Sequence, residues 1–284
     1  MLDASNIFTL LKTSEKFLSL HNISEAKLDT EILLSSILNI KRSSLFTIRS
    51  SPITEKQLRL YKSYLKRRIK REPVAYILGE SEFMGLNFKI TTDVLIPRQE
   101  TELLVEEANR QIKHNNYRDI LDICTGSGCI AVSVAYENKN ISVTASDISK
   151  EALNVALYNA KLNNVNSKIE FLISNMFNSI KDKKFDIIIS NPPYITRDEF
   201  KTLEKELFFE PEKALIAEED GISFYREIAE KGKKYLNDNG KIILELNSNI
   251  SKKIVELFEM QKFKKIKIIK DYANLDRILV LKNG

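Results

Sequence analysis

The sequence predicts an α/β protein in which a mostly parallel sheet, covered on both faces by helices, follows a small bundle of helices. From residue 119 onward, apolar runs rich in β-branched residues alternate with segments of helical periodicity. Such alternation is typical of a parallel sheet, because each parallel crossover needs a covering helix. The first 72 residues show helical spacing without a strand pattern, and a hydrophobic fraction of 43% suffices for a sizeable core.

Residues 1–72 are expected to form a helical domain of their own. Apolar residues recur at three-to-four spacing in two stretches: Ile7, Leu10, Leu11, Phe17 and Leu18, then Ala26, Leu28, Ile32, Leu33, Leu34 and Ile37. This spacing is the pattern of amphipathic helices. A further helix is expected to begin near Thr54, after Pro52.

The end of that further helix is strongly basic. Its cations are Lys62, Lys66, Arg67, Arg68, Lys70 and Arg71. Such a run could contact RNA phosphates or an acidic protein face. Because charge runs usually form a solvated surface, we favour an exposed helix face with Tyr64, Leu65 and Ile69 turned inward.

Residues 73–97 have a different sequence pattern from the helical residues before them, and this pattern predicts a linker that contains a β-hairpin. Gly79 and Gly85 flank a short segment, and Leu86, Phe88 and Ile90 then alternate with polar residues, as in a strand. Pro97 interrupts the chain, and a helix is expected to open at Thr101. Residues 98–284 are expected to form the sheet-containing domain.

Seven strands are predicted in that domain, with helices between most of them. The strands are expected at 119–124, 142–147, 169–174, 185–190, 241–246, 264–270 and 277–282, and the helices at 130–137, 150–163, 223–235 and 252–258. The last two strands lie too close together for a helical crossover. One of them should therefore run antiparallel at the sheet edge.

The net charge and the cysteine content bear on which partner, metal and cellular location we expect for the protein. The formal net charge of +5 is a mild excess that neither requires nor excludes a nucleic-acid partner. Cys124 and Cys129 are the only cysteines and supply at most half of a zinc site, so no metal is expected. Free thiols suit a reducing cytosol. With neither a leader pattern nor an apolar run of roughly 18 residues, we expect a cytoplasmic location.

A nucleoside site is predicted where the first two strands of the sheet end. Gly126 and Gly128 allow a tight turn whose amides approach a ligand at the start of the next helix. Asp147 ends the following strand, where a carboxylate can bind the two hydroxyls of a ribose. The patterns of a dinucleotide site and of a P-loop are both missing. Met176 and its neighbours Asn175 and Phe177 either lie along an adenine or form a polar loop with one core aromatic.

The apolar strand 185–190 is followed by Asn191, Pro192, Pro193 and Tyr194. Neither proline has a backbone N–H, and both have a restricted φ, so this loop is stiff and leaves carbonyl groups free. An amide side chain, a rigid carbonyl and an aromatic ring at the end of a strand suit the binding of a planar NH2 group.

These segments carry a family resemblance. The order DICTGSG, Asp147, SNMF and NPPY resembles the Rossmann-like class I methyltransferases that use S-adenosylmethionine. The segment from Pro73 to Glu107 is similar to the bacterial release-factor glutamine N5-methyltransferases, the HemK or PrmC family. The resemblance covers residues 70–282, while the helical N-terminus agrees only in length and character.

The resemblance implies a role for each matching residue. Cofactor contacts would come from Cys124, Thr125, Gly126, Ser127, Gly128, Asp147, Met176 and Asn191, and substrate contacts from Asn191, Pro192, Pro193 and Tyr194. Asn191, Pro192 and Tyr194 would be catalytic, and the substrate would be the glutamine in the GGQ loop of a peptide chain release factor. The helical domain would dock that protein. Departures from the family pattern are Cys124 (often glycine), Asn175 (often aspartate), Gln99 (often proline) and ELNSNI at 245–250, which matches a family EIG segment only loosely.

Two other readings remain open. The same loop fits an exocyclic amino group of DNA or RNA, which would require a base-flipping pocket. A glutamine of a ribosomal protein cannot be separated from one of a release factor by these motifs. A nucleotide-binding scaffold without activity is disfavoured, because both Asp147 and the NPPY loop are intact.

Overall fold

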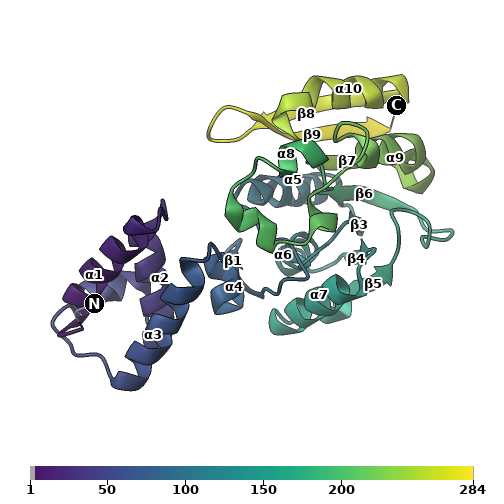
Figure 1. The fold of residues 1–284 in the computed structure, drawn as a ribbon. Coiled ribbons are helices and arrows are strands. Elements are labelled where there is room, and N and C mark those ends of the chain that lie inside the picture. Colours follow the sequence, from purple (N-terminus) through teal and green to yellow (C-terminus); the bar gives the residue numbers. More distant parts are fainter. Residues whose placement is uncertain (1–3, 284) are drawn as a thin grey trace. The chain divides into compact units, whose positions relative to one another are not determined.

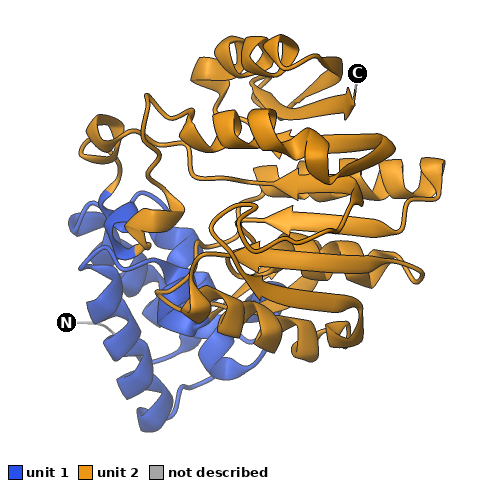
Figure 2. Ribbon diagram, turned by 90° about the vertical axis from the view of Figure 1, so that its right-hand side faces the viewer, with its two compact units in different colours: residues 1–79, 205–209 blue, residues 80–204, 210–284 orange. Residues whose placement is uncertain are grey.

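The structure is a computed structural model that describes residues 4–283. The chain forms two compact units, which Figure 2 colours separately: a helical unit that runs to Gly79 and takes in Lys205–Phe209, and a sheet unit that comprises Glu80–Glu204 and Glu210 onward. In the described part of the chain, no helix has the length and apolar character that a membrane span needs.

The helical unit is built from four α-helices. They are α1 (Ile7–Leu20), α2 (Ala26–Leu38), α3 (Glu55–Arg68) and α4 (Val74–Leu78), with 3-10 turns at Arg42–Phe46 and Lys205–Phe209. As predicted, the third helix starts at Thr54, whose side chain caps it and which forms a reciprocal capping box with Gln57. Leu10, Leu33 and Tyr61 are fully buried between the helices and form the core of this unit.

The expectation that the basic end of α3 is a solvated face is wrong at Arg68. Leu65 is buried as expected, but the Arg68 side chain is only 7% exposed and pairs with Asp29 at 2.7 Å and Glu206 at 2.9 Å. Arg71 also approaches Glu206, at 3.4 Å. A buried arginine needs such partners to offset the loss of hydration. Lys62, Lys66 and Lys70 are exposed.

The sheet unit begins with the predicted hairpin. Its strands are β1 (Glu80–Phe83) and β2 (Leu86–Lys89), which pair antiparallel. The main sheet contains β3 (Asp119–Ile123), β4 (Ser142–Asp147), β5 (Ile169–Ile173), β6 (Phe185–Ser190), β7 (Leu236–Glu245), β8 (Phe263–Lys270) and β9 (Asp276–Asn283), in the spatial order β5-β4-β3-β6-β7-β9-β8. The first five of these in that order are parallel. One of the last two strands, β9, is antiparallel as predicted, but it does not lie at the sheet edge, because it is inserted between β7 and the edge strand β8.

Helices cover both faces of this sheet (Figure 1). They are α5 (Glu100–Asn115), α6 (Cys129–Glu137), α7 (Lys150–Leu162), α9 (Ser223–Lys231) and α10 (Ser251–Met260), while the short α8 (Arg197–Phe200) lies in the connection between β6 and α9. Leu121, Ile123 and Leu244 pack in one cluster with residues of α9 and α10. The alternate strand residues, such as Ile120 and Ile243, are equally buried but point to the other face, where α5, α6 and α7 pack. This arrangement explains why the strands read as continuous apolar runs.

Candidate functional site

The register of the sheet places three of the predicted residues side by side. Ile123 at the end of β3 pairs with Ser146 of β4 and with Ser190 of β6. The next residue of each strand is Cys124, Asp147 and Asn191, so all three leave the sheet at the same carboxyl edge. Because β4 and β6 flank β3 on opposite sides, this edge is the topological switch point, where open α/β sheets bind their ligands.

The glycine turn and the acidic residue are joined by backbone hydrogen bonds. The Gly126 amide donates to Oδ2 of Asp147 at 2.9 Å, and the Ser149 amide donates to Oδ1, also at 2.9 Å. Burial raises the pKa of Asp147, while these two hydrogen bonds and the charge of Lys213 act in the opposite direction. The carboxylate is therefore held in one orientation by the backbone, and because two carboxylate oxygens offer about four acceptor positions, it can still accept from a ligand.

Three residues of the turn, Cys124, Gly126 and Gly128, have a left-handed backbone. Gly128 has φ +78°, and a Cβ at this position would lie 2.9 Å from Cβ of Ala156 on α7. Only glycine allows this close approach of turn and helix. Cys124, which stands where the resembling family often has glycine, has φ +61°. Burial raises the pKa of its thiol well above the ordinary range, and its sulfur contacts Sδ of Met176 at 3.9 Å.

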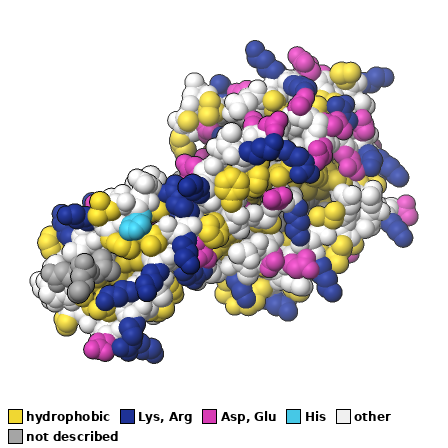
Figure 3. All heavy atoms as spheres, in the orientation of Figure 1, with side chains coloured by type: hydrophobic (Ala, Val, Ile, Leu, Met, Phe, Trp, Pro, Cys, Tyr) yellow, Lys and Arg dark blue, Asp and Glu magenta, His cyan; other side chains and the backbone are white. Residues whose placement is uncertain are grey.

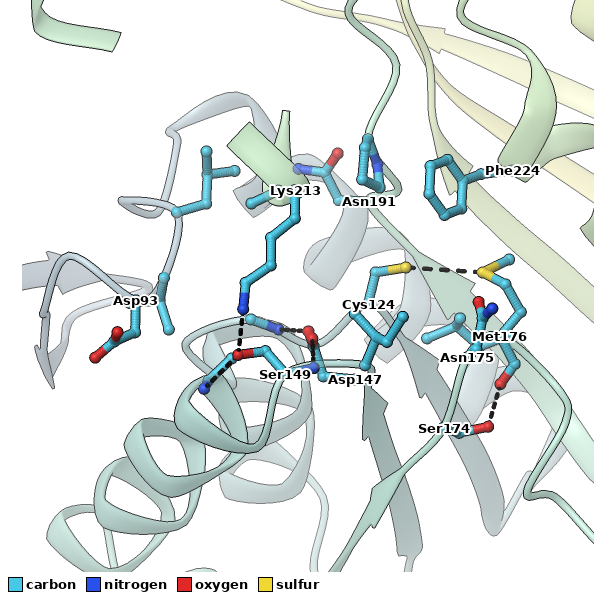
Figure 4. A pocket seen from close by; sticks show the side chains of 18 of the residues that line it. Asp93, Cys124, Asp147, Ser149, Ser174, Asn175, Met176, Asn191, Lys213 and Phe224 are labelled. Atoms are coloured by element: carbon cyan, nitrogen blue, oxygen red, sulfur yellow. Dashed lines mark hydrogen bonds between the residues drawn. The ribbon is translucent and has the colours of Figure 1, made fainter. Parts of the chain in front are cut away.

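A cavity of about 360 Å³ opens at this edge of the sheet (Figure 4). Predicted residues that line it are Cys124, Gly126, Asp147, Met176, Asn191 and Pro193. Its apolar lining includes Ile148, which is 58% exposed, and Met176, which is buried. A carboxylate, an open turn and apolar side chains in one cavity fit the ribose and the flat base of a nucleoside. Nothing lies within 4 Å of a Cβ built on Gly126, so the turn leaves room for a ligand at this point.

A small adjoining cavity of about 40 Å³ is lined by Thr125 and Ser127, together with Cys124, Gly126 and Asn191. Neither cavity is lined by Gly128, Pro192 or Tyr194. Gly128 precedes α6 as its N-cap, and Pro192 is buried. Tyr194 is partly buried against the core formed with α9 and α10. The structure thus brings most of the predicted residues together at the two cavities, whereas these three line neither of them.

Several residues at the site were not predicted, and four of them contact or lie near the predicted ones. Lys213 and Phe224 line the large cavity, and the Lys213 side chain extends toward Asp147 and donates to Oγ of Ser149 at 2.7 Å (Figure 4). Thr101 and Glu245 are buried next to Asn191 and are joined to it by hydrogen bonds. Thr101 lies in the segment from Pro73 to Glu107 that carries the family resemblance, and Glu245 lies in the ELN segment, a loose match to a family motif.

No cluster of three or more histidine, cysteine or acidic side chains with the arrangement of a metal site occurs within residues 4–283. Both cysteines are free. The donor set at the cavity, an amide, a carboxylate and backbone N–H groups, instead suits an organic ligand with hydroxyl and amino groups.

Two family models match this chain. The methyltransferase small domain matches residues 99–221, and the PrmC N-terminal domain matches residues 9–79. The sequence is 38% identical over 278 residues to the release factor glutamine methyltransferase of Fusobacterium nucleatum. The aligned region covers 97% of this chain and 78% of that protein. The sequence is 39% identical over 266 residues to the release factor glutamine methyltransferase of Thermodesulfovibrio yellowstonii, with 93% of each chain covered.

Solved structures share the fold at lower identity. The hMettl16 catalytic domain, solved in complex with an RNA hairpin, is 16% identical with a TM-score of 0.56, covering 80% of this chain and 82% of that one. The T. thermophilus 16S rRNA N2 methyltransferase RsmC, solved with AdoMet and guanosine, is 17% identical with a TM-score of 0.53, covering 72% and 50%. These similarities support the class I methyltransferase fold.

Proposed function

The chain belongs to the family of release factor glutamine methyltransferases, and on this premise we infer that it is a protein-(glutamine-N5) methyltransferase. It transfers a methyl group from S-adenosylmethionine to the side-chain amide nitrogen of a glutamine in a peptide chain release factor. The observation that carries this inference is the emergence of Asn191 beside Cys124 and Asp147 at one edge of the sheet, so that an amide-binding loop adjoins a nucleoside site.

The residues around the large cavity fit the nucleoside part of S-adenosylmethionine. We propose that Asp147 accepts hydrogen bonds from the ribose hydroxyls and that Met176 packs on the adenine. The turn Cys124–Gly128 would hold the methionine part. When bound, the cofactor supplies a methyl group activated by a sulfonium. The conformation of Asp147 is already set by the Gly126 and Ser149 amides, so little rearrangement is needed on binding.

The NPPY loop provides the amide-binding groups. A glutamine amide nitrogen is a weak nucleophile because its lone pair is delocalised into the carbonyl group. We propose that Oδ1 of Asn191 and the Pro192 carbonyl accept its two N–H bonds and aim the nitrogen at the methyl group. Pro193 and Tyr194 would hold the flat amide. Positioning of this kind can lower a barrier by roughly 7–11 kcal/mol, and acceptors facing an increasingly acidic NH2 stabilise the transition state further.

The proton leaves the nitrogen once the methyl group has arrived, so a strong general base at the amide is unnecessary. His21 lies just beyond α1 and His114 lies in α5, and neither lines the cavity. Asn191 is partly buried and its neighbours Pro192 and Pro193 are buried, which restricts solvent around the acceptor oxygen and strengthens its hydrogen bonds to the substrate.

We further propose that the helical unit docks the release factor and that the enzyme works in the cytoplasm. The exposed cations Lys62, Lys66 and Lys70 on α3 and just beyond it offer a surface for an acidic protein face. Their joint substitution by glutamate in the full chain should raise KM for the release factor and leave the affinity for S-adenosylmethionine unchanged.

The comparisons do not favour methylation of a nucleic acid or of a ribosomal protein. Binding to nucleic-acid phosphates depends on clustered cations. On the face drawn in Figure 3, basic and acidic side chains are interspersed rather than collected into one basic stripe, so this face does not favour a nucleic-acid substrate.

The deciding experiment incubates the enzyme with S-adenosylmethionine and a purified release factor, followed by mass spectrometry of the peptides. We expect the mass of one methyl group replacing a hydrogen on a single glutamine peptide. Parallel reactions contain ribosomal protein, ribosomal RNA or DNA. Labelling of one of these, with none of the release factor, would refute the proposed substrate.

A further inference from the structure

A chain of two hydrogen bonds, one buried and one partly buried, ends on the amide of Asn191. The Thr101 hydroxyl donates to Oε2 of Glu245 at 2.7 Å, and Nδ2 of Asn191 donates to the Thr101 oxygen at 3.2 Å. Thr101 is 2% exposed and Glu245 is 1% exposed. Three segments distant in sequence, the first turn of α5 and the ends of β6 and β7, therefore meet at Asn191, and Thr101 also lines the small adjoining cavity.

The sheet register builds this meeting point. Ser190 of β6 pairs with Leu244 of β7, so the next residues, Asn191 and Glu245, leave neighbouring strands side by side. The main chain of Glu245 is held as well, because the buried Tyr225 hydroxyl donates to its carbonyl at 2.8 Å. Ser190 donates from its hydroxyl to the Ile123 carbonyl at 2.7 Å, which ties the Asn191 end of β6 to β3.

The number of protons decides which way the Asn191 amide faces. A threonine hydroxyl has one proton and two lone pairs. When that proton points to an ionised Glu245, only lone pairs remain toward Asn191, and these accept from an NH2 group but repel an amide oxygen. Nδ2 must then face Thr101, and Oδ1 must face away from it.

We propose that Thr101 and Glu245 are positioning residues that orient the Asn191 amide and so present its oxygen to the NH2 group of the substrate glutamine. This inference rests on the proposed function of the site and extends it to two residues that do not line the large cavity. With the amide reversed, an NH2 group would meet another NH2 group, and the nitrogen of the substrate would lose one of its two acceptors.

The state of Glu245 determines whether this orientation persists. The pKa of Glu245 is raised to about 7, because burial and the charge of Glu100, which raise it, outweigh the Thr101 hydrogen bond and the charges of Arg277 and Arg98, which lower it. The phenols of Tyr194 and Tyr225 also face this carboxyl group. Above this pKa the carboxylate accepts from Thr101. Below it the carboxylic acid can donate instead, which releases the threonine proton toward Asn191 and favours the reversed amide.

The test uses Thr101→Val, Thr101→Ser and Glu245→Gln in the full-length enzyme. Thr101→Val keeps the shape of the side chain but removes the hydroxyl. We expect kcat to fall by about 10- to 100-fold, the loss that is typical when a group that orients a metal ligand by a hydrogen bond is removed. The Kd of S-adenosylmethionine should stay unchanged. Thr101→Ser restores the hydroxyl and should recover kcat. Thr144→Val, a buried threonine on β4, is the matched control and should retain the native kcat.

Glu245→Gln removes the ionisable group. The native kcat should decline as the pH falls through about 7, whereas the kcat of Glu245→Gln should lose this acidic limb. An undiminished kcat in Thr101→Val, no recovery in Thr101→Ser, or an unaltered acidic limb in Glu245→Gln would each overturn the proposal.

A readout without turnover separates this proposal from the proposed function. In 15N-labelled enzyme, the side-chain NH2 signal of Asn191, assigned by its loss in Asn191→Ala, should exchange slowly with solvent in the native protein and in Thr101→Ser. It should exchange faster in Thr101→Val. Equal exchange in all three proteins would refute the hydrogen-bond chain even if the release factor were not the substrate.

Discussion

The Gly126 amide donates a hydrogen bond to Oδ2 of Asp147 at 2.9 Å. This bond connects the turn after β3 to the end of β4, two segments that the resemblance assigns to different parts of one cofactor. It also holds the carboxylate in place before any ligand binds. A nucleoside therefore binds to a carboxylate that is already ordered, so little free energy is lost in ordering this group on binding.

Asp147→Ala should weaken cofactor binding. The ribose would lose hydrogen bonds to a charged group, each worth about 1.5–3 kcal/mol, so we expect the Kd of S-adenosylmethionine to rise by at least roughly tenfold. Isothermal titration calorimetry measures this directly. The exposed Asp238→Ala, on β7, serves as the control and should bind like the native protein. An unchanged Kd in Asp147→Ala would remove Asp147 from the proposed contacts.

Asn191→Ala should separate binding from transfer. The cofactor should still bind, because Asp147 and the glycine turn are untouched, but kcat should fall by about 100-fold through loss of one oriented acceptor. Transfer of a labelled methyl group to the release factor reports the rate. Asn178→Ala, an exposed position after β5, should leave the rate unaltered. Full activity in Asn191→Ala would contradict the assignment.

Gly128→Ala and Gly126→Ala should differ in stability. Both glycines have positive φ, so both substitutions strain the backbone, but only a Cβ at Gly128 would meet Ala156, at 2.9 Å. We expect Gly128→Ala to lose about 1–3 kcal/mol more than Gly126→Ala, the usual cost of overpacking. Urea unfolding without cofactor measures the two free energies. Equal losses would mean that the turn and α7 can separate at no cost.

Arg68→Met should destabilise the helical unit. The Asp29 carboxylate, 9% exposed, would lose its 2.7 Å partner, and breaking a buried pair on one side costs about 3–5 kcal/mol. Arg59→Met breaks the exposed pair with Glu55, whose side chains are 71% and 88% exposed, and should cost less than about 1 kcal/mol. Denaturant unfolding of both variants at neutral pH makes the comparison.

The same pair predicts a pH dependence. Burial already raises the pKa of Asp29, and loss of Arg68 raises it further, so the folded variant takes up a proton more readily than the unfolded chain. The difference in free energy of unfolding between the native protein and the less stable Arg68→Met should therefore become smaller as the pH falls below neutral. A difference that grows in acid would argue against an unpaired carboxylate as its cause.

Much of the active site was accessible from local sequence patterns. The apolar strands, the turn with Gly126 and Gly128, Asp147 and the NPPY loop are each encoded within a few neighbouring residues. Once a parallel sheet is predicted, the carboxyl ends of its strands must share one edge. The sequence by itself thus determined the fold class, the family and the segments that meet at the cavity.

Only the tertiary structure decided which distant residues support the segments that meet at the cavity. Thr101 and Glu245 are 144 positions apart and Arg68 and Glu206 are 138 positions apart, and no periodicity relates residues at such separations. Arg68 looked like part of a solvated run because its neighbours are charged, yet helix packing and the segment Lys205–Phe209 bury it. Strand register likewise makes Glu245 the neighbour of Asn191. Burial and pairing depend on which distant segments pack together, and that is a property of the folded chain.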